Sequence, residues 1–126
     1  MTLIVRNTCY GGYGVSVEAQ RMLLERGCKH IHLEKYNRNR SLTEMEIAEF
    51  CQSLGILQVG PDTWANDTHR YENRDCEVLV QVVRELGARA NGKHADLEVV
   101  EIPDDVEWVI DEYDGAETIR EKHRSW

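Results

Sequence analysis

A glycine-rich segment near the start of the chain has the residue types of an anion site. It lies between a short apolar run and a helical pattern, where backbone N–H groups ahead of a helix N-terminus can surround a phosphate. Its tyrosine rings offer flat surfaces on which a base could stack. A tight strand-to-helix turn that needs glycine for positive φ would explain the same pattern. The candidate binding residues are Cys9, Tyr10, Gly11, Gly12, Tyr13, Gly14 and Ser16.

Two arginines near the other end of the sequence form a second candidate. Arg120 and Arg124 are four residues apart in a helix predicted over 117–124, so both could reach one phosphate. The alternative is pairing within the helix, with Glu117 and Glu121 as partners. Arg70 and Arg74 form a weaker candidate for a second anion site.

Other chemistries find less support. His30, His32 and Glu34 would share one face of a predicted strand, yet such a trio is common by chance, and we expect no metal centre. The spacing excludes the Rossmann and P-loop glycine motifs. No Ser-His-Asp or Cys-His arrangement is legible along the chain, so we predict no catalytic residue and no cofactor.

The cysteine spacing also excludes several site types. The four cysteines, at positions 9, 28, 51 and 76, form no Cys-x-x-Cys pair, which argues against a zinc ribbon or a thioredoxin-like site. Cys51 and Cys76 lie in helical patterns and are expected to be small buried apolar residues.

The elements that must position these residues follow from periodicity and turn signals. We predict an α+β fold in the order β-α-β-α-α-β-β-α, with a mixed sheet and a C-terminal hairpin followed by a helix. The predicted helices begin near Ser16, at a Ser41–Glu44 capping box, at Asp75 and at Glu117. The predicted hairpin joins strands 97–102 and 106–110. Residues 58–74 show no sustained periodicity and are predicted to be a long loop.

Composition sets the class of protein. The 126 residues suit a single domain spanning 1–126, and 15 basic against 23 acidic residues give a net charge of −8. That charge argues against binding to duplex nucleic acid. We find neither eighteen consecutive apolar residues nor a basic-then-apolar leader, so we expect no membrane partner and a cytoplasmic location.

Three blocks of the chain resemble a known family. Residues 7–16, 85–92 and 101–126 resemble small phage proteins that carry a C-Y-G-G-F loop and a Y-D-G…H-R-x-W tail, the first Thoeris anti-defence family. Here Tyr13 stands where that loop has Phe, and residues 35–74 match nothing in the family. The resemblance implies a sponge that sequesters cyclic ADP-ribose isomers in the infected bacterial cell without cleaving them. It also implies a homo-oligomer, either a dimer or a trimer of dimers, and in some members a separate site for cyclic oligonucleotides. Asn91 and Tyr113 join the glycine loop and the C-terminal arginines as its candidate binding residues.

Two other functions remain open from the sequence. The first is an enzyme that degrades the same class of ligand, and the second is an inhibitor that binds a protein through its acidic surface and long loop. An anionic ligand also requires the arginines to be locally concentrated, because the whole chain is acidic.

Overall fold

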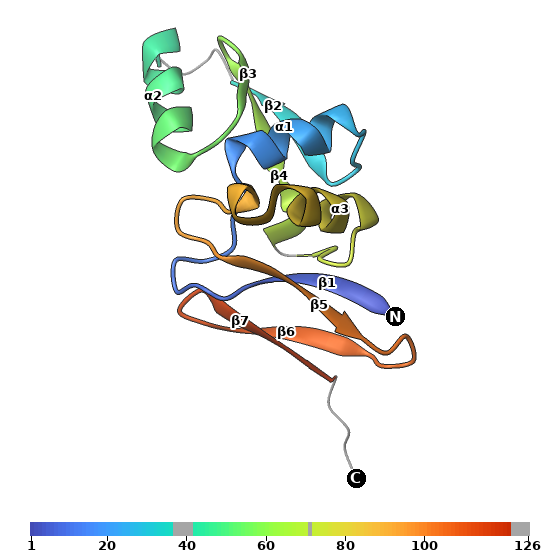
Figure 1. The fold of residues 1–126 in the computed structure, drawn as a ribbon. Helices are drawn as coiled ribbons and strands as arrows, with labels where there is room; N and C mark the ends of the chain where they lie inside the picture. Colours follow the sequence, from blue (N-terminus) through green and yellow to red (C-terminus); the bar gives the residue numbers. More distant parts are fainter. Residues whose placement is uncertain (37–41, 71, 122–126) are drawn as a thin grey trace.

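The computed structural model describes residues 1–36, 42–70 and 72–121 (Figure 1). The α-helices are α1 (Val17–Glu25), α2 (Glu44–Leu54) and α3 (Glu77–Leu86), and the short 3₁₀ helices are η1 (Thr68–Arg70) and η2 (Gly87–Ala90). The strands are β1 (Thr2–Asn7), β2 (Ile31–Lys35), β3 (Gln58–Gly60), β4 (Thr63–Asp67), β5 (Leu97–Ile102), β6 (Trp108–Tyr113) and β7 (Ala116–Glu121).

The centre of the molecule is the antiparallel pair β1–β5, covered on one side by α3 (Figure 1). Ile4 and Val5 of β1 are fully buried. The apolar stripe of α3 recurs at helical spacing and buries Leu79 and Val82 completely. Val5, Leu79 and Val82 belong with Leu23 of α1 to one core cluster, on which the rest of the fold is built.

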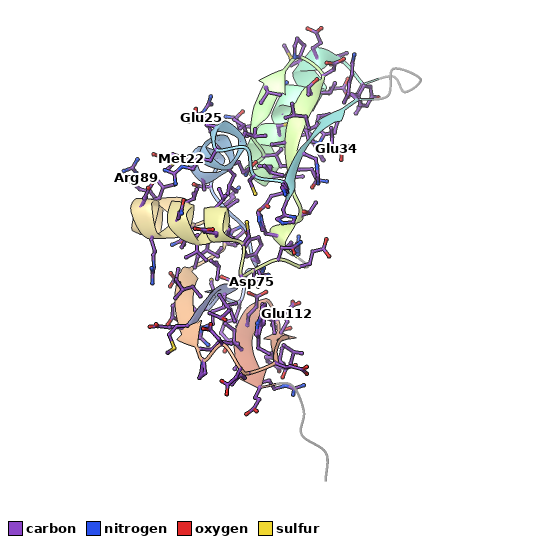
Figure 2. All side chains as sticks on the ribbon, turned by 90° about the vertical axis from the view of Figure 1, so that its right-hand side faces the viewer. Met22, Glu25, Glu34, Asp75, Arg89 and Glu112 are labelled. Atoms are coloured by element: carbon purple, nitrogen blue, oxygen red, sulfur yellow. The ribbon has the colours of Figure 1, made fainter. Side chains whose placement is uncertain are left out.

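Helix α1 connects this centre to a second sheet of order β2–β4–β3. Ser16 caps the helix by accepting a hydrogen bond from the N–H of Ala19. The buried Gln20 donates to the carbonyl oxygens of Val15 and Gly55, so α1 is tied to the end of α2. In Figure 2, Arg89 of η2 lies beside α1, and its guanidinium pairs with a glutamate in the first turn of that helix.

The hairpin β6–β7 lies on the other side of β1–β5 from α3 (Figure 1). Its turn residues Asp114 and Gly115 have φ of +51° and +91°, as a two-residue type I′ hairpin turn requires. Strand β7 contacts β1, where the N–H of Asn7 donates to Oε1 of Glu117 over 2.8 Å. Figure 2 labels Glu34 of β2 and Glu112 of β6, which are exposed on the sheet β2–β4–β3 and on the hairpin, respectively.

The predicted α+β fold with a C-terminal hairpin is confirmed, but several of its details are wrong. The predicted mixed sheet is replaced, within the described residues, by three small sheets that are antiparallel throughout. The predicted helix 117–124 is strand β7 as far as Glu121, because the Asp-Gly turn pairs it with β6. Strand 97–102 pairs with β1, so the hairpin forms one strand later than predicted.

The middle of the chain also differs from prediction. The predicted loop 58–74 contains β3, β4 and η1. Thr43 and Glu46 form the capping box of α2, whereas the predicted cap Ser41 lies outside the described residues. Cys76, rather than Asp75, holds the N-cap position of α3. None of the helices in the described segments has the length and apolar character needed to cross a lipid bilayer.

Candidate ligand pocket

A cavity of about 550 Å³ opens beside the glycine-rich loop, a volume within the usual range of small-ligand sites. Four segments build its wall: the loop with the start of α1, the end of α2, strand β4 with η1, and the turn that follows η2. The lining residues are Gly11, Gly12, Tyr13, Gly14, Val15, Ser16, Val17, Gln20, Leu54, Gly55, Ile56, Trp64, Ala65, Asn66, Asp67, Arg70, Asn91, Gly92, Lys93 and His94.

The glycines let the loop lie directly against the turn at 91–94. The N–H of Gly92 donates to the carbonyl of Gly14 over 2.9 Å, next to an isolated bridge between Val15 and Asn91. A Cβ on Gly11 would lie 2.2 Å from the carbonyl oxygen of His94. The loop therefore needs glycine for close backbone approach, and Asn91 belongs to its support.

The turn of the C-terminal hairpin packs beneath the same loop. The amide of the buried Asn7 donates to the carbonyls of Cys9 and Gly115 over 2.7 and 2.8 Å. A Cβ on Gly115 would lie 2.4 Å from the backbone nitrogen of Gly12. The loop and the Tyr-Asp-Gly turn, far apart in sequence, are thus one structural unit.

Arg74 is part of the buried support under the loop. Its side chain is 3% exposed and forms a bidentate ion pair with Glu117, with both N–O distances at 2.6 Å. The remaining donors reach the carbonyls of Val5, His69 and Arg70. All five guanidinium N–H donors are thereby used within the protein, and none is left for an anion.

Tyr13 is held in the same network and does not offer a free ring for stacking. The guanidinium carbon of Arg74 lies 3.9 Å from its ring centroid, and its hydroxyl donates to Asp67 over 3.1 Å. Burial raises the pKa of the Tyr13 hydroxyl well above its usual range, and the Asp67 carboxylate raises it further. Tyr13 therefore stays a neutral hydrogen-bond donor.

The charged side chains that line the cavity are mostly cationic. Arg70 and Lys93 are exposed at its wall, and the guanidinium of Arg70 lies 3.9 Å from the position that a Cβ on Gly12 would take. The acid among the lining residues is Asp67, which already accepts bonds from Tyr13 and His69. A chain of net charge −8 thus concentrates positive charge beside the glycine loop.

Trp64 supplies the aromatic surface that the sequence analysis had assigned to tyrosines. It comes from β4, lines the cavity and packs edge-on against Phe50 of α2, with ring centroids 6.2 Å apart. The sequence does not single out Trp64, because residues 58–74 are predicted to be a loop. The alternation of Trp64 and Asn66 along a strand was the available signal.

Several predicted binding residues lie away from the cavity. Tyr10 and Tyr113 are 71% and 75% exposed and are not among its lining residues. Arg120 pairs with Asp111 across the hairpin. The clamp predicted for a helix is therefore wrong in its geometry, and Arg124 lies outside the described residues. Cys9 is held at both backbone groups by the side chain of Asn7.

The three residues that were considered as a metal trio, and for which no metal centre was expected, separate as well. His32 and Glu34 are exposed on β2, whereas His30 turns toward His69, with ring centroids 5.3 Å apart.

A cluster of Cys28, His69 and Cys76 lies inside the fold and was not predicted. Their potential ligand atoms all lie within 4.8 Å of one another. Cys76 had been expected to be an ordinary buried apolar residue, but it holds a helix cap position beside a second thiol. The separation of 28, 69 and 76 in sequence gives no recognisable spacing, so only the fold reveals the group.

The environment sets the protonation of the three side chains. Burial lowers the pKa of His69, but the hydrogen bond and charge of Asp67 outweigh it and leave the pKa raised. Burial raises the pKa of Cys76, yet the backbone N–H of Leu79 and the His69 ring outweigh it, so this thiol has a lowered pKa. Burial raises the pKa of Cys28.

The chain has no significant match to a family model, a curated protein or a solved structure. The functional argument therefore depends on the residues around the cavity. The fold brings the predicted loop residues from Gly11 to Ser16 together with Asn91 and Arg70 at this one site.

Proposed function

We propose that the protein binds a cyclic ADP-ribose isomer or a related cyclic nucleotide in this cavity and sequesters it without cleavage. Such a protein would act as a phage anti-defence sponge in the cytoplasm of the infected bacterial cell. The observation that carries the proposal is the pairing, in one cavity, of a glycine loop flanked by Arg70 and Lys93 with the indole of Trp64.

The two walls suit the two chemical parts of such a ligand. Arg70 and Lys93 can form charge-assisted hydrogen bonds to a phosphate, of about 1.5–3 kcal/mol each when water is excluded. Base stacking on an aromatic ring such as that of Trp64 contributes about 1–3 kcal/mol. Together these terms offset the unfavourable overall charge of the chain.

The arrangement supports binding rather than turnover. Ser16 is engaged as the helix cap and donates its own proton to the carbonyl of Arg89. Asp67 is held by Tyr13 and His69, so it is not available to a substrate. Among the described lining residues we therefore find no nucleophile hydrogen-bonded to a general base.

Calorimetric titration of a cyclic ADP-ribose isomer tests the proposal. We expect Arg70→Ala to weaken binding about tenfold to a hundredfold, because one charge-assisted hydrogen bond to phosphate is lost. Arg84→Ala is the matched control, since Arg84 is exposed on α3 and lines a different cavity. Equal affinity of wild type and Arg70→Ala would contradict the site.

Heating the complex separates a sponge from an enzyme. After thermal denaturation of the protein, we expect chromatography to recover the ligand intact. Recovery of a hydrolysed product would instead show that the protein is an enzyme that degrades the ligand. The absence of any nucleotide binding would favour an inhibitor that binds another protein.

We also propose that the protein assembles into a closed homo-oligomer, either a dimer or a trimer of dimers. Large apolar side chains are exposed on β2, on α2 and just before it, and on β3, around one end of the molecule. Their burial between copies would be favourable in proportion to the apolar area removed from water. These side chains are Leu33, Leu42, Met45, Phe50, Leu54 and Val59.

A further inference from the structure

We propose that Cys28, His69 and Cys76 bind a zinc ion through two thiolates and one imidazole. The three residues come from the turn after α1, from η1 and from the cap of α3, so the ion would join three separate elements. This inference does not require that the pocket bind a ligand, although Asp67, which holds His69, also lines the pocket.

The distances from Sγ of Cys28 to the other two ligand atoms are close to those of a tetrahedral zinc site. Sγ of Cys28 lies 4.0 Å from Sγ of Cys76 and 3.7 Å from Nε2 of His69. With zinc–sulfur bonds of about 2.3 Å and zinc–nitrogen bonds of about 2.0–2.1 Å, tetrahedral ligand atoms lie about 3.6–3.8 Å apart. A shift of a few tenths of an ångström would bring Cys28 to these distances, and the ligand atoms of Cys76 and His69 lie within 4.8 Å of each other.

Asp67 holds His69 in the form that binds metal. Its Oδ1 lies 2.5 Å from Nδ1 of His69 and also accepts the backbone N–H of His69 over 3.1 Å. A carboxylate only accepts, so Nδ1 carries the proton and Nε2 faces the cysteines. A carboxylate behind a histidine is the usual outer partner of a zinc ligand.

Charge balance favours zinc in this buried place. Two thiolates neutralise the ion, and the two thiol protons leave to solvent as the metal binds. Cys28 is 8% exposed and His69 is fully buried, whereas Cys76 remains partly exposed. The ion can enter at Cys76, where the fourth coordination position is left to water.

The same three residues favour a metal ion over a catalytic cysteine. A nucleophilic thiol must reach a substrate, but Cys28, His69 and Cys76 line none of the described cavities. A second thiol within 4.0 Å of the first has no role in a Cys–His–Asp mechanism, whereas soft thiolate pairs select zinc.

The experiment compares metal binding by wild type and Cys76→Ser. Serine suits a helix cap, so this variant should fold while losing one thiolate. We expect one zinc per wild-type chain by mass spectrometric metal analysis. We also expect cobalt(II) to give thiolate charge-transfer absorption and the visible bands of a tetrahedral ion. Both signals should be lost in Cys76→Ser, and zinc should raise the melting temperature of wild type only.

Two further variants sharpen the result. Cys51→Ala removes a buried cysteine outside the cluster and should retain both signals. Asp67→Asn should weaken zinc binding about 10- to 100-fold while keeping the ligand set. Equal zinc affinity in wild type and Cys76→Ser would overturn the proposal. So would a Cys28–Cys76 disulfide in freshly purified protein, shown by intact mass before and after reduction.

Discussion

At the scale of single residues, the site depends on glycines that serve packing rather than flexibility. Gly115 combines a φ of +91° with backbone atoms of Tyr10 and Gly12 that lie within 2.5 Å of where a Cβ would be. Gly27 has a φ of +69°, but nothing lies within 4 Å of its Cβ position. Substitution at Gly27 therefore measures backbone strain alone, whereas substitution at Gly115 measures strain and steric contact together.

We predict that Gly115→Ala is more destabilising than Gly27→Ala. The strain of positive φ costs about 1–2 kcal/mol at either position. Contact with the glycine loop adds about 1–3 kcal/mol at Gly115 alone. Urea unfolding of both variants measures the difference, and equal losses would show that the hairpin turn does not pack tightly against the loop.

At the scale of elements, the hairpin β6–β7 is attached to the body of the fold by polar groups. Glu117 of β7 receives the guanidinium of Arg74 and the backbone N–H of Asn7, all of them buried. Arg120, three residues further along the same strand, makes its ion pair with Asp111 within the hairpin, where both side chains are about half exposed. One strand thus carries a buried pair and an exposed one.

Loss of the buried ion pair should lower the free energy of unfolding far more than loss of the exposed one. Arg74→Ala leaves the Glu117 carboxylate buried without its cation, which we expect to lower the free energy of unfolding by about 3–5 kcal/mol. Arg120→Ala should lower it by less than about 1 kcal/mol. Chemical denaturation at neutral pH measures both, and similar effects would mean that the Arg74–Glu117 pair is exposed to water in solution.

The elements differ in how far local sequence determines them. The start of α1 at Ser16 and the Val-rich apolar stripe of α3 could be predicted from the sequence, because helix caps and helical periodicity are local signals. Strand β7 was missed because its Glu and Arg residues suit a helix, and only pairing across the Asp114-Gly115 turn selects a strand. The prediction of a loop before α3 was wrong for a similar reason, since β4 pairs with the distant strand β2 as well as with the adjacent β3.

The same reasoning applies to the candidate site. The glycine loop was predicted from its own residues, and it does line the cavity. Arg74 and Arg70 looked alike in sequence, yet one is buried in an ion pair and the other faces the cavity. Burial of that kind depends on tertiary packing around Glu117, which spacing does not encode.

At the scale of the whole molecule, polar and apolar surfaces are unevenly distributed. Helix α2 buries Ile47 and Cys51 but exposes Met45, Phe50 and Leu54. A monomer would leave these side chains in water beside the mouth of the cavity, to which Leu54 and Trp64 contribute. Assembly through α2 would cover these apolar side chains and, at the same time, narrow the opening of the cavity.

We therefore predict at least a dimer in solution. Light scattering at micromolar concentration should give a mass of twice 14.6 kDa or a higher even multiple. Phe50→Glu should shift the mass toward the monomer, because a charge would enter the apolar surface, whereas Arg84→Ala should leave it unchanged. A wild-type mass of a single chain would contradict the prediction.

The antiparallel pairing of the first strand with β5 has a consequence for how the protein is made on the ribosome. Thr2 pairs with Ile102, and the loop that follows the strand rests on Gly92 and Gly115. Strand β1 thus waits for a partner that is synthesised much later, and contacts of such long sequence separation slow folding. A nascent chain can complete the wall of the cavity only after the turn at 91–94 has been made, and it can seat the glycine loop on the hairpin turn only after Gly115 has followed.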